Sequence, residues 1–214
     1  MTEDLEKNSI REFNSWARTY DNSILHFFFT RSNKSIVKLL PLTKEVSILD
    51  VGTGTGILIG QVLLKNKSAH LFGVDNSPEM LNKAKSKFQG KNNVTITLGS
   101  ANKLPYEDNS FEFVTCANSF HHHPDSLNSL KEMKRVLKPG GKVILSDGSL
   151  DGFLRQKVFK AENSNHKERK VYRYTKGQMK DLFIQAGLIN ISQYYSLHFN
   201  LVTVGEKRSQ NCRN

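Results

Sequence analysis

Short strand-like runs alternate with amphipathic segments through the middle of the chain, and this alternation restricts the fold more than any other feature. The strand-like runs, mostly apolar, cover residues 46–51, 69–75, 93–100, 111–119 and 142–147. The amphipathic segments, with a helical period of apolar residues, cover 57–65, 77–88 and 126–138. Nearly continuous apolar runs are typical of strands buried on both faces, and strands alternating with helices form βαβ units. Because βαβ crossovers are right-handed, the pattern predicts a mostly parallel, doubly wound α/β sheet.

Two of the predicted helices carry end signals. Ser77 is a good N-cap, and Pro78 at the next position has the backbone angle of a first helical residue. The segment 126–138 runs into Pro139-Gly140-Gly141, which predicts that this helix stops there.

The two ends of the chain differ from the middle. In residues 1–30, Phe13, Trp16, Ala17 and Tyr20 recur at spacings of three and four, which predicts a helix with one aromatic face. A second helix is expected over 33–41, ending before Pro41. After a helix over 175–187 come two β-rich runs, 189–197 and 199–207. They are joined too closely for a parallel crossover, so we expect them to pair antiparallel at one edge of the sheet.

Length and composition narrow the class of protein. The 214 residues suffice for one α/β domain, and 37% hydrophobic with 24% charged residues is an ordinary globular balance. No apolar run approaches the length of a membrane helix, and the polar first residues do not resemble a secretory signal. Cys116 lies in an apolar run and Cys212 in a polar tail, so we expect no disulfide framework and a cytoplasmic location.

Glycines at alternate positions follow the first strand, in the stretch "ILDVGTGTG" of residues 48–56. Glycine has no Cβ, so a ligand can approach the backbone closely at such a turn. A dinucleotide fingerprint would need its third glycine where the chain has Ile57 or Ile59, and no P-loop lysine follows. Asp75 ends the second strand about 20 residues after the turn, the usual place for an acid that accepts the hydroxyls of a ribose. The spacing therefore favours an adenosine-bearing ligand other than a nicotinamide or flavin dinucleotide.

Four ordered motifs give the chain a family resemblance: "ILDVGTGTG", "GVDNSPEML", "GSANKLPYEDNSFEFVTCANSFHHHPD" and "LKPGGKVILSD". Together they resemble the class I S-adenosylmethionine-dependent methyltransferases, most of all the branch of the ubiquinone and menaquinone biosynthesis methyltransferases, closely over about residues 45–147. The resemblance implies a Rossmann-like, doubly wound sheet of seven strands with an antiparallel last strand and helices on both faces. It also implies a division into a helical cap (1–44), a cofactor-binding domain (45–207) containing a basic substrate-side segment (154–176), and a tail (208–214).

The same resemblance implies the roles of particular residues toward S-adenosylmethionine, whose product is S-adenosylhomocysteine. The loop would wrap the methionine part, Asp75 would hold the ribose, and other positions would contact the adenine, the sulfonium or the acceptor. The implied cofactor-binding residues are Tyr20, Gly52, Thr53, Gly54, Thr55, Gly56, Asp75, Asn76, Met80, Ser100, Ala101, Ala117 and Asn118. Many relatives have an aspartate in place of Ser100, whose hydroxyl is a weaker acceptor. Asp50 is expected to organise the loop.

Methyl transfer from a sulfonium needs positioning more than a nucleophile, so the absence of a readable catalytic triad is no objection. A general base is needed only where the acceptor loses a proton. His121 and His122 follow the fourth strand and are the candidate bases; the alternative is a structural role at a helix start. Adjacent side chains point in different directions, so the run His121–His123 does not predict a metal site.

The formal charge of +11 leaves the partner open. The basic residues of 154–176 raise the hypothesis of an anionic small-molecule acceptor, against the alternative of a solvated helix with a hinge at 163–165. An RNA methyltransferase or RNA-binding protein is a rival, disfavoured because no aromatic–basic stacking motif or appended RNA-binding domain is present. A third alternative is a protein that binds the cofactor without catalysis. A monomer or a homodimer is expected.

Overall fold

The computed structural model describes residues 10, 11, 14, 24–41, 44–152, 156–157, 171–196 and 200–209, with backbone only for 24–29. The aromatic residues predicted to share a face of the first helix, Phe13, Trp16 and Tyr20, lie outside these residues. So do 158–170, the larger part of the basic segment.

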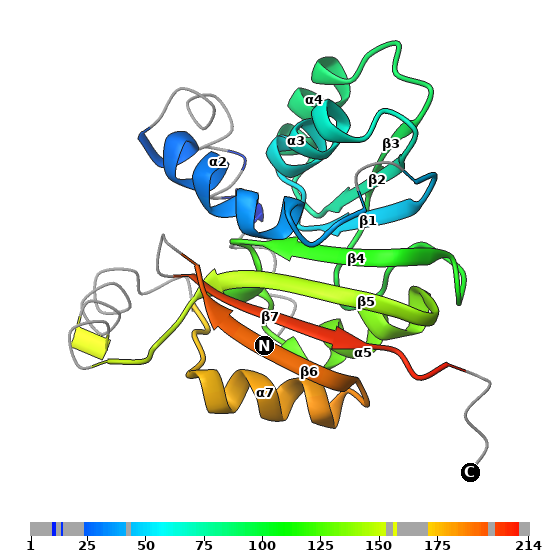
Figure 1. Ribbon diagram of the computed structural model, residues 1–214. Coiled ribbons are helices and arrows are strands. Elements are labelled where there is room, and N and C mark those ends of the chain that lie inside the picture. The colour runs from blue at the N-terminus through cyan, green and yellow to red at the C-terminus, as the bar shows by residue number, and fades with distance from the viewer. Residues whose placement is uncertain are drawn as a thin grey trace.

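The described chain forms one seven-stranded sheet with the order β3-β2-β1-β4-β5-β7-β6 (Figure 1). The strands are β1 (Ser47–Val51), β2 (His70–Asp75), β3 (Val94–Leu98), β4 (Phe111–Ala117), β5 (Leu137–Gly148), β6 (Ile189–Tyr195) and β7 (Asn200–Glu206). The pairs from β3 through β5 are parallel, whereas β7 runs antiparallel to both β5 and β6. The predicted doubly wound sheet and its antiparallel last strand are confirmed.

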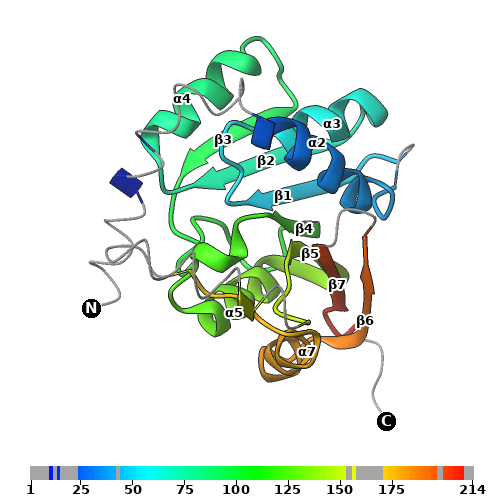
Figure 2. The ribbon, with the colours of Figure 1, turned by 90° about the vertical axis from the view of Figure 1, so that its left-hand side faces the viewer.

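Helices cover both faces of this sheet. They are α2 (Ile24–Val37), α3 (Ile57–Lys65), α4 (Pro78–Lys87), α5 (Ser126–Val136) and α7 (Lys176–Gln185), with a short 3-10 turn η1 (Phe120–His122). Figures 1 and 2 show α2 and α3 on one face and α5 and α7 on the other. None of the helices in the described part of the chain is long and apolar enough to cross a membrane.

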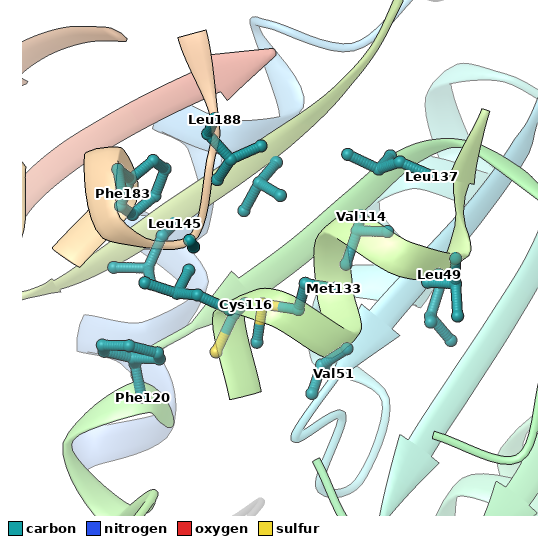
Figure 3. Packing of buried hydrophobic residues seen from close by; sticks show 14 of the residues in the cluster. Leu49, Val51, Val114, Cys116, Phe120, Met133, Leu137, Leu145, Phe183 and Leu188 are labelled. Atoms are coloured by element: carbon teal, nitrogen blue, oxygen red, sulfur yellow. The ribbon is translucent and has the colours of Figure 1, made fainter. Parts of the chain in front are cut away.

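Each face has its own apolar cluster. Between the sheet and α5 and α7, Val114, Met133 and Phe183 are completely buried, and Figure 3 shows them packed side by side with Leu145. On the opposite face, Ile36 of α2 and Leu58 of α3 pack against residues of β1 and β2. Burial on both faces is the reason why the central strands are mostly apolar.

Helix α4 begins as its sequence predicts: the backbone N–H of Met80 donates to Oγ of the N-cap Ser77 at 3.3 Å, with Pro78 in the first turn. Two boundaries were predicted wrongly. Helix α2 runs continuously from Ile24 to Val37, so no separate helix begins at 33. Helix α5 ends at Val136, before the Pro-Gly-Gly run, because the buried Leu137 already pairs with Phe111 as the first residue of β5.

Candidate active site

A pocket opens at the carboxyl ends of β1, β2, β3 and β4, the edge at which open α/β sheets bind ligands. Most of the predicted cofactor-binding residues line it: Gly52, Thr53, Gly54, Thr55, Asp75, Asn76, Met80, Ser100, Ala101, Ala117 and Asn118. Gly56 does not line the pocket, and Tyr20 lies outside the described residues. Two lining residues that the sequence did not single out as ligand contacts are Asn33 and His123.

The three glycines of the loop are needed for different structural reasons. All three are left-handed, with φ of +70° at Gly52, +53° at Gly54 and +77° at Gly56. A Cβ on Gly52 would lie 1.9 Å from Oγ of Ser119, and one on Gly56 would lie 2.5 Å from the ring of Phe88. A Cβ on Gly54 would meet no atom within 4 Å. Gly52 and Gly56 are therefore packing positions, and Gly54 turns a bare backbone toward open space.

Asp75 joins the glycine loop to the end of β2. The N–H of Gly54 donates to Oδ2 of Asp75 at 2.8 Å, and the N–H of Ser77 donates to Oδ1 at 2.9 Å. Burial raises the pKa of the Asp75 carboxyl, and hydrogen bonds from neighbouring backbone N–H groups partly offset the rise. A carboxylate has about four lone-pair sites, so each oxygen can accept a further hydrogen bond from a ligand.

Asp50 is the last polar residue of β1 and comes two positions before Gly52 of the loop. The hydroxyl of Thr115 in β4 donates to Oδ1 of Asp50 at 2.9 Å. Burial raises the pKa of Asp50 to about 7, although the hydrogen bond from Thr115 opposes the rise. The loop itself is held by the N–H groups of Gly52 and Thr53, which both donate to the carbonyl of Val74. Asp50 therefore bonds to β4, and its part in organising the loop stays a prediction.

The adenine side of the predicted site ends at Ser100 and Ala101, which follow β3. Oγ of Ser100 accepts from the N–H of Asn102 at 3.2 Å. Met80 is buried and lines the same pocket from α4. Serine at position 100, where many relatives have aspartate, thus places a small hydroxyl in the pocket wall.

The adjacent histidines have different surroundings, although the rings of the first two lie against each other. Nδ1 of His121 lies 2.7 Å and 2.9 Å from the two carboxylate oxygens of Asp147, and the backbone N–H of His121 donates to the same group. His121 does not line the pocket, whereas His122 does, and their ring centroids are 3.9 Å apart. His123 also lines the pocket; burial lowers its pKa to about 4, and its Nδ1 has no hydrogen-bond partner among the described residues.

Asp147 has no assigned part in the sequence prediction. It stands at the end of β5, beside the end of β4, and is buried. Burial alone would raise its pKa, but the charge and hydrogen bonds of His121, with the charge of Arg173, lower the pKa of Asp147 below its ordinary value. The sequence signal that could have identified Asp147 is an acidic residue at the end of the strand next to the histidines. Within the described ranges, no group of His, Cys, Asp and Glu side chains is placed to hold a metal ion.

The comparisons with known proteins agree with this geometry. Residues 49–145 match the model of the methyltransferase domain family. Demethylmenaquinone methyltransferase of Staphylococcus aureus (strain MRSA252) is 37% identical over 145 residues, which cover 65% of this chain and 59% of that protein. The chain thus aligns with only about three fifths of the length of this curated relative.

Solved structures share the fold. The methyltransferase in a complex with the Haloferax volcanii Trm112 methyltransferase activator superposes with a TM-score of 0.78 at 21% identity, covering 92% of this chain and 98% of that one. Phosphoethanolamine N-methyltransferase 2 of Haemonchus contortus, solved with S-adenosyl-L-methionine, has a TM-score of 0.71 at 22% identity, covering 84% of this chain and 53% of that one.

The strand order and the reversed β7 form a Rossmann-like fold that the chain shares with solved methyltransferase structures. Residues 49–145 of the chain are similar to the methyltransferase domain family, and over 145 residues the chain is similar to demethylmenaquinone methyltransferase.

Proposed function

We propose that the protein transfers a methyl group from S-adenosylmethionine to a small-molecule acceptor. The observation that carries this proposal is the pairing of the Gly54 backbone, open on one side, with the Asp75 carboxylate across a 2.8 Å hydrogen bond. A ligand with vicinal hydroxyls next to a flexible amino-acid arm fits this arrangement, because the acid accepts from hydroxyls and the bare loop admits the arm.

The residues that line the pocket support binding of the whole donor. Ser100, Ala101 and Met80 would contact the adenine, and Asp75 would hold the ribose. The loop from Gly52 to Thr55 would surround the methionine part, and Ala117 would lie near the sulfonium. When bound, S-adenosylmethionine supplies a methyl group that its sulfonium has already activated.

The residues of the protein itself position the donor and the acceptor and, where needed, accept a proton. Holding donor and acceptor in line is worth up to ~7–11 kcal/mol in favourable cases. Where the acceptor must lose a proton, His122 is the better placed base, since it lines the pocket. His121 would act behind it, with its ring packed on His122 and its Nδ1 held by Asp147.

The division into a cap and a cofactor-binding domain remains part of the proposal. Two contacts support it: Asn33 of α2 lines the pocket, and Oγ of Ser77 donates to Oδ1 of Asn14 at 2.7 Å, two residues from Asp75. We also retain a cytoplasmic location and a monomer or homodimer as expectations; the buried Cys116 is a free thiol.

A more specific form of the proposal is that the methyl acceptor is anionic. The basic excess of 154–176 motivates it, and Arg173 lies close to Gly148 at the end of β5, where a Cβ on that glycine would be 2.1 Å from Nη1. We expect reversal of Lys167, Arg169 and Lys170 to glutamate to raise the KM of an anionic acceptor and spare that of a neutral one. Equal KM values before and after reversal would remove the anionic class.

Calorimetry with S-adenosylmethionine and S-adenosylhomocysteine tests the proposal. Binding of both, lost or strongly weakened in Asp75→Ala, is the expected result. A screen of metabolite extracts with labelled methyl donor then identifies the acceptor. Absence of heat and of any rise in melting temperature with either compound would refute the function. A salt-dependent gel shift with tRNA, with no small-molecule methylation, would favour the RNA alternative that the +11 charge suggests.

A further inference from the structure

Three asparagines from distant parts of the chain form a hydrogen-bonded relay at the pocket. Nδ2 of Asn200, the first residue of β7, donates to Oδ1 of Asn118 at 2.6 Å. Nδ2 of Asn118 then uses its two hydrogens for Oγ of Ser32 at 2.9 Å and Oδ1 of Asn33 at 3.2 Å, both on α2. Asn118 itself is left-handed, with φ of +52°, and its N–H donates to the carbonyl of Ser146. The relay therefore couples the orientations of the three amides.

Asn33 is the end of this relay and has a donor to spare. Only 3% of its surface is exposed, and it lines the pocket. Its Oδ1 accepts from Asn118, but its Nδ2 makes no hydrogen bond to any residue in the described ranges. Although the side chain as a whole is buried, this donor is not sealed off by the protein, so it is available to an acceptor that arrives from the pocket.

The sheet order shows which part of a ligand would meet Asn33. Along the carboxyl edge the pocket residues follow the order Ser100 after β3, Asp75 after β2, Gly54 after β1 and Asn118 after β4. A nucleoside with its base at Ser100 and its ribose at Asp75 extends its other end over β1 toward β4. Asn33 touches Asn118, so it stands at that far end, where the amino-acid group of the methyl donor carries its carboxylate.

We propose that Asn33 is a ligand-binding residue that donates its amide hydrogen to the carboxylate of the methyl donor, and that Asn118 and Asn200 are positioning residues that orient it. This inference rests on the proposed function. It gives β7, which does not line the pocket, an influence on ligand affinity through two hydrogen bonds.

Asn33→Asp tests the donor directly. An aspartate still accepts from Asn118, but it has no hydrogen to donate and repels a carboxylate. A hydrogen bond to a charged group accounts for about tenfold to hundredfold in affinity. We expect calorimetry to show S-adenosylhomocysteine binding weakened by at least about tenfold, with 5′-methylthioadenosine, which lacks the amino-acid end, bound as by the wild type.

Asn200→Asp tests the relay. A carboxylate at 200 accepts from Nδ2 of Asn118 and so reverses that amide. Asn118 then presents its oxygen to Asn33, which donates to it and turns its own oxygen toward the pocket. We expect the same selective loss for S-adenosylhomocysteine, smaller than in Asn33→Asp. Asn92→Asp is the matched control, since it makes the same charge change at an exposed turn before β3.

The outcomes separate the inference from the function. Selective weakening of S-adenosylhomocysteine in both relay variants supports the assignment. Unchanged or tighter binding in Asn33→Asp overturns it, as does equal weakening of both nucleosides, which would mean general damage to the pocket. A wild-type protein that bound neither nucleoside would overturn the proposed function and this inference with it.

Discussion

Alanine at Gly52 and at Gly54 should separate packing from ligand access within one loop. Both residues are left-handed, and a Cβ in that conformation costs ~1–2 kcal/mol. At Gly54 nothing else is affected, because its Cβ would meet no atom within 4 Å. At Gly52 the new Cβ would lie 1.9 Å from Oγ and 2.6 Å from Cβ of Ser119, so overpacking adds a further ~1–3 kcal/mol.

We therefore expect Gly54→Ala to lower the free energy of unfolding by about 1–2 kcal/mol and Gly52→Ala by about 2–5 kcal/mol. Ligand binding should follow the opposite order, since only the methyl group of Gly54→Ala projects into the open pocket. Urea denaturation at constant m-value measures the first quantity, and calorimetry with S-adenosylhomocysteine measures the second.

Ser119→Gly in the Gly52→Ala background removes both clashing atoms and supplies the control. The double-mutant cycle should return about 1–3 kcal/mol of coupling between positions 52 and 119, with no coupling between 54 and 119. Equal destabilisation by the two alanine variants, or no recovery in the double mutant, would refute the assignment of Gly52 to packing and Gly54 to access.

Three further predictions concern buried groups and a helix end. The pKa of Asp50 is raised to about 7 from 3.8, so the folded state binds the extra proton and stability should fall as pH rises from about 4 to about 7. Asp50→Asn should remove that slope, roughly 4 kcal/mol in total, in unfolding curves measured across this range; a wild-type slope in the variant contradicts the pKa. Asp147→Asn should lower kcat and alter its pH profile while S-adenosylhomocysteine affinity stays unchanged, because the carboxylate holds His121 behind the pocket; an unaltered kcat would deny that part to Asp147. Thr175→Ala removes the capping box of α7 and should cost ~1 kcal/mol in thermal or urea unfolding, whereas the exposed Lys180→Ala in the same helix should cost less.

Local signals predicted the elements well and their boundaries less well. Ser77 and Pro78 start α4 because capping depends only on neighbouring residues. The end of α5 could not be read from Pro139, because Leu137 leaves the helix earlier to fill the core and pair with Phe111. Tertiary burial outweighed the local stop signal at that position.

Some residues of the candidate site could likewise be predicted from the sequence and others could not. The loop residues and Asp75 were predictable because they follow strand ends at fixed spacings. Asn33 was not, since one asparagine in a helix gives no indication of what its amide contacts. His121 and Asp147 were visible as polar residues after neighbouring strands, but their 2.7 Å contact depends on β4 and β5 being adjacent.

The sequence by itself determined the order of strands and helices, the carboxyl edge at which we propose that a ligand binds, and the family that the chain resembles. These follow from hydrophobic period and short motifs, which act over a few residues. Only the tertiary structure decided which glycine is open, which histidine lines the pocket and which amides connect α2, the end of β4 and β7. Asn118 lies 85 residues from Asn33 and 82 from Asn200, and packing of the sheet and helix alone brings such groups within hydrogen-bonding distance.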